Sequence, residues 1–424
     1  MAKGVTVGID IGTTSVKAVA ADDAGRVLAR ARVPHPVKSA HAGELAHDAA
    51  VAWCDGVLAA LAQVSPEIDV RAVNVAAMVP SLCAVDRAGR PVSDGLLYGD
   101  GRGAGTDPTR SPAGSGELVR FLAWLTGAYP DAAGYWPAQA VANHALGGVA
   151  AMDTVVAMTA VPLFDFTGWD AGVAAEAGLD DLSRLPSLAA GQSAIAEVDA
   201  AGDDGDVLVI LGSTLIVWAV VPEWIEVEGL WTVPHTAFGK TLVGGASNAG
   251  GLFLSWADHL IVCDDAEPAA AFDIGDVPVW QPFVRGERVP LHDPDRRASL
   301  HDLHIGTTPA AARHAALEAS AFAVRHLLDL AGGAGRRIVA TGGGVQRAGW
   351  VQALADVTGL PVDVVAVPEG AALGAAYLAR VTAGLEVDAS GASRWARTAH
   401  RVEPDAATNT VVTERYHRYR ELVG

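Results

Sequence analysis

The stretch VTVGIDIGTTSVKAVAADDAGRVLA, residues 5–29, decides the fold of this chain. Two apolar runs flank a Gly-Thr-Thr-Ser turn, and a second turn follows at residues 22–25. Apolar runs joined by short turns predict a β-hairpin that extends into a meander. Asp10 stands directly before the first turn, so a carboxylate and a hydroxyl-rich turn share one end of the predicted hairpin.

The same arrangement returns in the second half of the chain, as DGDVLVILGSTLIVWAVV at residues 204–221. Its apolar run is shorter than the ~20 residues of a membrane helix and is interrupted by Gly-Ser-Thr, which favours two buried strands joined by a turn. A repeated strand-turn-strand opening indicates a duplicated fold. A chain of 424 residues is long enough for two domains. We place the boundary in the acidic stretch at 197–206, which predicts domains at 1–204 and 205–424.

Further elements follow from the apolar patterns. Helices are predicted at 49–64, 117–127, 308–331 and 369–381, a buried strand at 71–78 and a hairpin turn at 86–89. Residues 103–115 are rich in Gly, Pro and Ser and predict a loop. Residues 336–359 read as a strand, a glycine-rich turn and a helix.

Composition excludes several classes of function. The net charge of −19 argues against a nucleic-acid partner or an anionic membrane surface. Three widely spaced cysteines without a CxxC pair make a disulfide framework or a zinc site a poor explanation, and they fit a reducing compartment. The first residues lack the pattern of a signal peptide, so we expect a cytoplasmic protein.

Three turns could hold a nucleotide. Backbone N–H groups in a Gly-Thr-Thr turn can cradle phosphate oxygens, and a strand-end carboxylate such as Asp10 suits Mg²⁺, usually through water. A second turn would close on the other phosphates, and three consecutive glycines would let a base or ribose approach the backbone. Neither GxGxxG nor GxxxxGK[ST] is present. The first two turns, taken alone, are more often ordinary hairpins, and each of the three is a weak signal by itself, but three in this order are a stronger signal. The residues concerned are Gly12, Thr13, Thr14, Gly212, Ser213, Thr214, Gly342, Gly343 and Gly344.

Over nearly its whole length the chain resembles the FGGY family of carbohydrate kinases, within the actin/hexokinase superfamily. DIGTTSVKA resembles the family's first phosphate loop, and LGST stands where the family has its second. VDRAGRPVSDGLLYGDGR resembles a block around the sugar site, with Tyr98 in place of the usual tryptophan and with Asp100 and Arg102 kept. GGASNAGG, FVRGERVPLHDPD, TGGGVQRAGWVQALADVTG and EGAALGAAYLA resemble the family's C-terminal signatures.

The resemblance implies an α/β fold of two ribonuclease-H-like (actin-like ATPase) domains with a cleft between them. ATP would lie mainly against the C-terminal domain, and the sugar mainly against the N-terminal one. The γ-phosphoryl group would pass to a hydroxyl of a ketose or polyol, with ATP and Mg²⁺ as cofactors. Lys17 and Gln346 would assist nucleotide binding, Asp10 the metal and the chemistry, and Tyr98, Asp100 and Arg102 the sugar. A homodimer is left open.

The sequence departs from the family pattern in two places. The family carries a catalytic aspartate on a strand before the second phosphate loop, and here that strand is expected to be deleted. Asp199, Asp203, Asp204 and Asp206 lie nearby, but a solvated acidic turn explains them better. Asp100 is therefore the substitute candidate for the base, against the alternative that it only orients Arg102. The second departure is Met78-Val79-Pro80, an apolar trio where the family often has polar, sugar-facing residues.

Other side chains have plainer explanations. Glu318 fits a position near the cleft or, equally, a surface or helix-capping role. Trp169, Trp280 and Trp350 are expected in cores. The loop holding His292, Asp293, Asp295, His301 and His304 could suggest a metal site, but we expect a structured surface loop.

Three readings remain open. The first is an ATP-dependent carbohydrate kinase. The second is a pseudokinase that binds nucleotide or sugar without efficient transfer, which the missing strand and the apolar trio favour. The third, an actin- or chaperone-like ATPase, lacks any matching extension.

Overall fold

A computed structural model describes residues 4–39, 43–66, 68–103, 116–189, 205–235, 240–261, 272–333 and 335–424. The chain forms two compact units. Unit 1 holds Met1–Asp199 together with Glu369–Trp395, and unit 2 holds Ala200–Pro368 together with Ala396–Gly424. The single boundary expected from the sequence, between 204 and 205, did not include this return of the chain to unit 1.

The main sheet of unit 1 begins with the predicted meander. Strands β1 (Val5–Ile11), β2 (Ser15–Ala21) and β3 (Val27–Pro34) are antiparallel neighbours, and β5 (Val70–Ala77) adds to β1 in parallel, in the order β3-β2-β1-β5. The meander and the strand predicted at 71–78 are confirmed.

One face of this sheet carries the core of unit 1. Val7, Ile9 and Ile11 alternate along β1 and are fully buried in a cluster with residues of the π-helical turn η1 (Ala50–Asp55), α1 (Gly56–Val64) and α3 (Ala138–Gly147). Period-two alternation of this kind is what a strand with one core-facing side requires. The helix predicted at 49–64 is thus present, with its first turn widened to π geometry.

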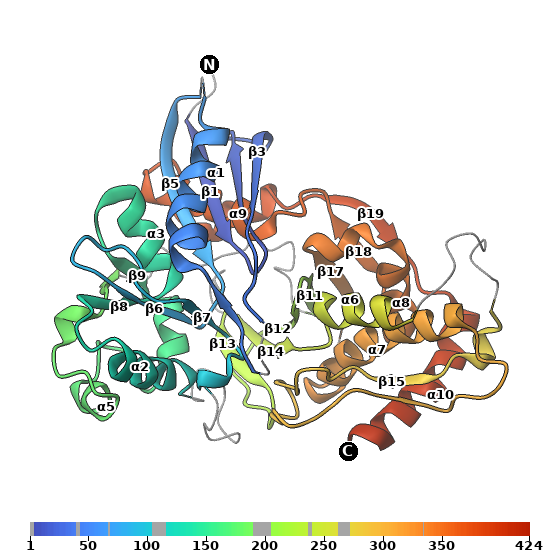
Figure 1. The fold of residues 1–424 in the computed structure, drawn as a ribbon. Coiled ribbons are helices and arrows are strands. Elements are labelled where there is room, and N and C mark those ends of the chain that lie inside the picture. Colours follow the sequence, from blue (N-terminus) through green and yellow to red (C-terminus); the bar gives the residue numbers. More distant parts are fainter. Residues whose placement is uncertain are drawn as a thin grey trace. The chain divides into compact units, whose positions relative to one another are not determined.

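The opposite face of β1 is covered by α9 (Gly370–Thr382), which returns from the far end of the chain (Figure 1). Thr6 donates its hydroxyl to the carbonyl of Ala376 at 2.7 Å. A Cβ on Gly8 would lie 1.8 Å from the Ala372 carbonyl oxygen and 2.3 Å from the Ala376 nitrogen. Gly8 is therefore required because backbone meets backbone, and the small residues of α9 serve the same close approach.

A second sheet in unit 1 has the order β4-β7-β6-β8, from β4 (Ala46–His47), β7 (Gly95–Leu97), β6 (Ser81–Val85) and β8 (Gly134–Trp136). The predicted turn after β6 is confirmed, because the N–H of Gly89 donates to the carbonyl of Asp86. A separate core here packs α2 (Glu117–Ala128), which confirms the helix predicted at 117–127. The remaining elements are η2 (Gly101–Gly103), β9 (Ala151–Asp153), α4 (Thr154–Ala157), η3 (Met158–Ala160), α5 (Ala171–Glu176), η4 (Leu182–Arg184), β10 (Ser187–Ala189) and η7 (Ala389–Arg394). Of the predicted loop at 103–115, residues 104–115 lie outside the described residues.

The sheet of unit 2 has seven strands in the order β13-β14-β12-β11-β17-β18-β19. At its centre, β11 (Asp206–Leu211) pairs antiparallel with β12 (Leu215–Val221) and parallel with β17 (Arg337–Thr341). The run VLVILGSTLIVWAVV is thus two strands and a turn, as predicted. The outer strands are β13 (Trp231–Pro234), β14 (Thr241–Ser247), β18 (Val362–Val365) and β19 (Thr398–Val402).

Helices α7 (Pro309–Leu330) and α8 (Ala348–Thr358) pack on one face of this sheet, α6 (Gly251–Leu260) packs against α7, and α10 (Ala406–Val423) packs against α7 and α8 (Figure 1). Val207, Val209 and Leu211 of β11 face that core. Trp280 and Trp350 are buried in it, as expected, while Trp169 packs half-buried against a core of unit 1. The sequence β11-turn-β12 followed by β14 and β17 repeats β1-turn-β2 followed by β3 and β5, so the predicted duplication is confirmed. The other elements of unit 2 are η5 (Ile274–Asp276), β15 (Val279–Gln281), β16 (Ser299–His301) and η6 (Gly343–Gln346).

Two acidic residues have partners that the sequence did not reveal. Asp206 is fully buried and accepts hydrogen bonds from Arg336 at 3.0 Å and from Arg337 at 2.9 and 2.6 Å, so its interpretation as part of a solvated turn is wrong. Glu318 is 1% exposed and forms a bidentate pair with Arg415 of α10, at 2.8 and 2.6 Å. Glu318 joins two helices and is neither a surface residue nor a cap. Asp199, Asp203 and Asp204 lie outside the described residues.

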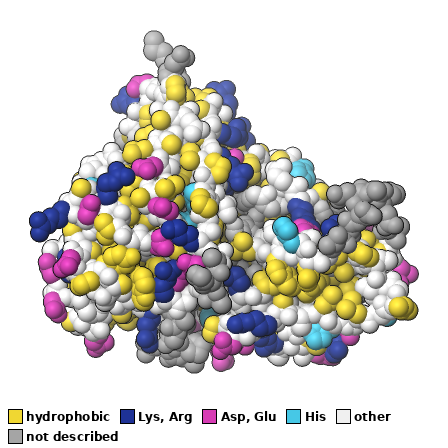
Figure 2. All heavy atoms as spheres, in the orientation of Figure 1, with side chains coloured by type: hydrophobic (Ala, Val, Ile, Leu, Met, Phe, Trp, Pro, Cys, Tyr) yellow, Lys and Arg dark blue, Asp and Glu magenta, His cyan; other side chains and the backbone are white. Residues whose placement is uncertain are grey.

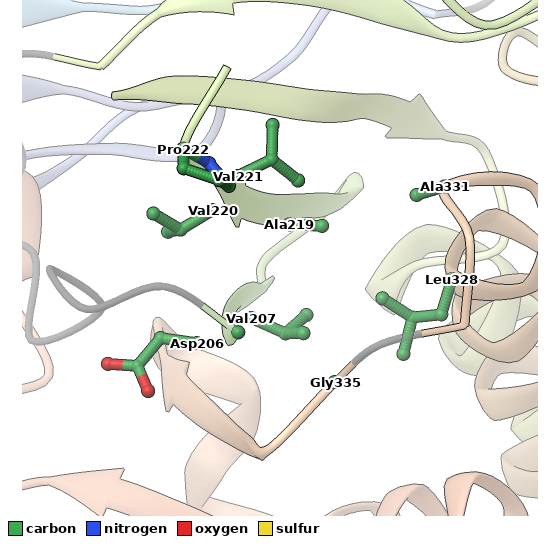
Figure 3. Close-up of a pocket in the computed structure, with 10 residues that line it drawn as sticks. Asp206, Val207, Ala219, Val220, Val221, Pro222, Leu328, Ala331 and Gly335 are labelled. Carbon is green, nitrogen blue, oxygen red and sulfur yellow. The ribbon is translucent and has the colours of Figure 1, made fainter. Parts of the chain in front are cut away.

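A cavity of about 300 Å³ lies in unit 2 at the beginning of β11 and is lined mainly by apolar residues, among them Val207, Val220 and Leu328 (Figure 3). The carboxylate of Asp206 points away from Leu328 in this view, in keeping with its two arginine partners. The predicted phosphate turn follows the other end of β11, so the cavity is separate from it by the length of the strand.

The surface of unit 2 shows apolar side chains gathered where α6 lies (Figure 2), and Trp256 and Leu260 of that helix are exposed by 40% and 58%. None of the described helices is both long enough and apolar enough to span a membrane.

Candidate functional site

Backbone hydrogen bonds hold the first turn, between β1 and β2, both within itself and to the residue that follows β3. The N–H of Gly12 donates to the carbonyl of Ser15 at 3.1 Å, and the N–H of His35 donates to the carbonyl of Thr14 at 3.1 Å. Thr13 is buried, while Thr14 is exposed. The two ends of the turn are therefore tied to the fold, and its tip at Thr14 is open to solvent.

Asp10 and Lys17 lie opposite each other on β1 and β2, beside this turn. The Lys17 Nζ atom is 3.8 Å from Asp10 Oδ2. Burial raises the pKa of the Asp10 carboxyl, and the Lys17 ammonium partly offsets this shift. A carboxylate in such a place gains from any further positive charge, which is the chemistry of an ion-binding oxygen.

Asp10 has no counterpart in the repeat. The turn after β11 aligns with the turn after β1, and the residue in the place of Asp10 is Ile210. Of the two matching turns, only the first therefore has a carboxylate at this position.

The residues predicted to face the sugar lie beside the first turn. The Tyr98 hydroxyl is 2.7 Å from the Thr13 hydroxyl. Asp100, 2% exposed, accepts hydrogen bonds from the backbone N–H groups of Leu45 and Arg102 and from the Arg102 guanidinium, at 2.7 to 2.9 Å. Because both carboxylate oxygens are already paired, this geometry favours Asp100 as the residue that orients Arg102 over Asp100 as a base.

The guanidinium of Arg102 lies over the ring of Trp124, with 5.1 Å between its central carbon and the ring centroid. Asp100 and Trp124 together hold the Arg102 side chain at one place in unit 1. The apolar trio also lies near the first turn, since the N–H of Met78 donates to the carbonyl of Ile11 at 3.1 Å. That N–H is therefore already hydrogen-bonded within unit 1.

The second turn is held by the start of α6. The N–H of Gly251 donates to the Gly212 carbonyl at 2.8 Å, and the N–H of Leu252 donates to the Ser213 carbonyl at 3.1 Å. These are first-turn donors that a helix cannot use internally. A Cβ on Gly250 would lie 2.5 Å from the Leu215 nitrogen, and one on Gly251 would lie 2.8 Å from the Gly212 carbonyl oxygen, which explains the two glycines at the start of α6.

The third turn, TGGGVQ, lies next to the second. Ile210 pairs with Thr341 across the parallel strands β11 and β17, so both turns follow the same end of the sheet. A Cβ on Gly342, whose φ is +90°, would lie 2.9 Å from the Leu211 carbonyl, and one on Gly344 would lie 2.4 Å from the Trp350 ring. A Cβ on Gly343 would meet nothing within 4 Å.

The three glycines therefore have different roles. Gly342 and Gly344 are required by the packing of the turn, and Gly343 presents bare backbone to solvent. Gln346 is exposed at the end of η6. Arg347 pairs with Asp258 of α6 at 2.8 and 3.1 Å, which links the supports of the second and third turns.

The sheet of unit 1 is shorter than its repeat. In unit 2, β18 lies beside β17, but among the described residues no strand lies beyond β5 in the corresponding place. The segment in which the sequence predicts a deleted strand includes residues 190–204, which lie outside the described residues, so the deletion stays a prediction. Within the described part of the chain no cluster of three or more His, Cys, Asp or Glu side chains is arranged to hold a metal ion.

His47, a residue that was not predicted from the sequence, lies directly beneath the first turn. Its Nε2 atom is 2.7 Å from the Thr13 carbonyl oxygen, and the indole N–H of Trp53 donates to its Nδ1 at 3.0 Å. A buried His-Asp-Ala pattern has no local signature, so no feature of the sequence alone pointed to it.

Both domains of one protein family match this chain. Residues 5–111 match the N-terminal domain of the FGGY family of carbohydrate kinases, and residues 208–383 match the C-terminal domain of the same family. The chain belongs to the FGGY family of carbohydrate kinases. The stretch between the two matches, 112–207, contains the segment where the family's catalytic strand is expected.

Individual relatives of this FGGY chain are sugar and polyol kinases. It is 27% identical to a xylulose kinase of Streptomyces coelicolor over 96% of this chain and 95% of that protein. It is 36% identical to a glycerol kinase of Allorhizobium ampelinum, but over only 46% of this chain and 41% of that protein.

Solved structures support the fold. Gluconate kinase from Lactobacillus acidophilus matches 99% of this chain and 97% of that one, with a TM-score of 0.82 and 18% identity. The predicted two-domain actin/hexokinase-like fold is thereby confirmed.

Proposed function

We propose that this FGGY chain is an ATP-dependent kinase that transfers the γ-phosphoryl group to a hydroxyl of a ketose or polyol. The observation that supports it best is the shared geometry of the first and second turns. The carbonyls of Thr13 and Ser213, which stand at aligned positions, and that of one neighbouring residue in each turn accept hydrogen bonds from the body of their own unit. In a planar trans peptide the C=O and the next N–H point to opposite sides, so the following N–H groups are turned outward. Outward N–H groups in a tight turn are donors for phosphate oxygens.

The residues present fit the nucleotide and its metal ion. The open backbone at Gly343 leaves room for a ribose or base, and the carboxylate of Asp10 is the oxygen ligand that Mg²⁺ prefers. Magnesium would supply charge neutralisation on the phosphates. Thr14, Ser213 and Thr214 would bind phosphate oxygens, Lys17 would add positive charge, and Gln346 would lie at the nucleotide's edge.

On the acceptor side we propose that Tyr98 and Arg102 bind the sugar. Tyr98 links the acceptor to the first turn through Thr13, and Asp100 holds Arg102 in place. Phosphoryl transfer depends more on positioning and charge neutralisation than on base strength, so Asp100 need not take the proton. Loss of a base would cost about 10²–10⁴ in rate without abolishing transfer.

The relatives support a ketose or a polyol as the acceptor. The xylulose kinase is the relative that aligns over nearly the whole chain, so a ketose is the first candidate and glycerol the second. The apolar trio offers no side-chain donors, which favours an acceptor bound mainly through Tyr98 and Arg102. None of the comparisons supports the pseudokinase alternative.

The test is ADP release from Mg·ATP with xylulose, glycerol and gluconate in turn, at high enzyme concentration. We expect release that depends on one acceptor and is lost in Asp10→Asn. ATP binding without acceptor-dependent release from any of the three would oppose this acceptor assignment and favour the pseudokinase.

A further inference from the structure

A buried pair of histidines lies directly under the first turn, on the side away from its exposed tip. His47 is completely buried on β4, and its ring centroid is 4.4 Å from that of His35, which follows β3. Among the described residues, neither histidine belongs to a cluster of side chains that could hold a metal ion. The His47 ring and the His35 backbone N–H instead form hydrogen bonds to carbonyls of the turn.

The hydrogen bonds of His47 fix its protonation. A carbonyl oxygen accepts only, so Nε2, 2.7 Å from the Thr13 oxygen, must carry the proton and donate it. An indole N–H donates only, so Nδ1, which receives the Trp53 donor at 3.0 Å, must be bare. His47 is thus the neutral Nε2–H tautomer with both ring nitrogens used.

Burial, with His35 as a second cause, lowers the pKa of His47 to about 4. The neutral form therefore persists through the physiological range. Burial also lowers the pKa of His35.

The fold makes specific room for this contact. His47 pairs with Gly95 across β4 and β7, and a Cβ on Gly95 would lie 2.2 Å from the Trp53 ring. Trp53 itself is fully buried and lies in the π-helical turn η1. π-Turns within helices are often found at functional sites.

The hydrogen bonds of the second turn indicate what the contact between His47 and the Thr13 carbonyl does. There, backbone N–H groups at the start of α6 draw the Gly212 and Ser213 carbonyls inward. At the first turn the described residues provide other donors: the His35 backbone N–H holds the Thr14 carbonyl, and the His47 ring holds the Thr13 carbonyl. The side chain of His47 thus does for the Thr13 carbonyl in unit 1 what the N–H of Leu252 does for the Ser213 carbonyl, at the aligned position in unit 2.

We propose that His47, held in its Nε2–H tautomer by Trp53, is a positioning residue for the first turn and orients the Thr13–Thr14 peptide so that the Thr14 N–H faces the nucleotide phosphates. This inference rests on the proposed function and adds a residue to it. His47 does not touch the substrate. It acts through one peptide plane, whose N–H points away from the carbonyl that His47 holds.

The test compares two substitutions at one position. Glutamine can place an amide N–H near the position of Nε2, whereas leucine fills space without a donor. We expect His47→Leu to weaken Mg·ATP binding by about 10- to 100-fold, as expected for a lost buried hydrogen bond, and His47→Gln to stay within about 3-fold. The KM for the acceptor should change less than that for Mg·ATP.

A matched control is His326→Leu. His326 is also a buried histidine, 3% exposed, but it lies on α7 against Tyr419. We expect this variant to be destabilised with an unchanged affinity for Mg·ATP. Isothermal titration gives the affinities, and thermal unfolding without nucleotide gives the stabilities.

A second measurement does not depend on activity. In protein labelled with ¹⁵N-histidine, the ring of His47 should show a proton on Nε2 and none on Nδ1, and Trp53→Phe should relax this preference. Equal Mg·ATP affinity in His47→Leu and wild type, or an Nδ1–H tautomer, would overturn the proposal. If wild-type protein binds no Mg·ATP, the proposed function fails instead, and the tautomer still tests the contact.

Discussion

The glycine triplet of the third turn gives a sharp prediction, because neighbouring glycines differ in what surrounds them. A Cβ on Gly344 would lie 2.4 Å from the Trp350 ring and 2.7 Å from Leu211, whereas a Cβ on Gly343 would meet nothing within 4 Å. Replacing each with alanine therefore separates packing from ligand binding at adjacent positions.

The expected magnitudes follow from these distances. The Trp350 ring is 3% exposed and its indole N–H donates to the Ser320 hydroxyl at 3.0 Å, so it cannot move aside freely. Overpacking costs about 1–3 kcal/mol, and a buried donor that loses its partner costs about 1–3 kcal/mol more. We expect Gly344→Ala to lose about 2–6 kcal/mol of unfolding free energy. Gly343→Ala should be as stable as wild type, or more stable by up to about 1 kcal/mol, since alanine suits a helical turn better.

Binding should show the opposite order. A methyl group on Gly343 would stand where the proposed nucleotide approaches the backbone, and should weaken Mg·ATP binding about 10-fold or more. Urea unfolding, followed by tryptophan fluorescence, measures the stabilities, and calorimetric titration measures the affinities. The reasoning is refuted if Gly343→Ala binds Mg·ATP like wild type, or if Gly344→Ala unfolds at the same urea concentration.

Two further predictions concern the supports of the site. Gly8→Ala should destabilise unit 1 by about 3 kcal/mol or more, because its methyl group would lie 1.8 Å from the backbone of α9. Gly127→Ala on α2 is the control and should be neutral or stabilising, because a Cβ there meets nothing within 4 Å. Equal urea midpoints for the two variants would contradict this prediction. Burial raises the pKa of Glu287 to about 8, so the folded state keeps a proton that the unfolded carboxyl releases near 4.5. Wild-type stability should therefore fall as the pH rises from about 5 to 8, and Glu287→Gln, which cannot ionise, should lose less over that window in urea unfolding. Equal losses of stability in wild type and in Glu287→Gln over this pH window would refute the assignment of the pH dependence to Glu287.

The sequence predicts the local elements well where a pattern is carried by neighbouring residues. The turn at Gly12 lies between two apolar runs of strand length, and the turn at Gly212 repeats it, so both hairpins and the duplication could be read directly. The triplet at 342–344 likewise stands between a clear strand and a clear helix. Family resemblance added the identity of the fold, which these patterns alone do not provide.

Partners distant in sequence account for what was missed. Asp206 looks like part of an acidic turn until β17 brings Arg337 beside it. The return of α9 to unit 1 was signalled only by Gly8, a glycine inside a strand, which often marks a close backbone approach. His47 and Trp53 carry no local pattern, because their function depends on the turn at Thr13, more than thirty residues earlier.

The central claim is that this chain transfers the γ-phosphoryl group to a sugar hydroxyl, and the most direct measurement is to follow the label of [γ-³²P]ATP. Each candidate acceptor is incubated with Mg·ATP and either wild type or Asp10→Asn, and the products are separated into sugar phosphate and inorganic phosphate. We predict label in a sugar phosphate for one acceptor with wild type, and about 10²-fold less or none with Asp10→Asn. Label found only in inorganic phosphate, whatever the acceptor, would contradict the kinase assignment and indicate an ATPase of the same fold.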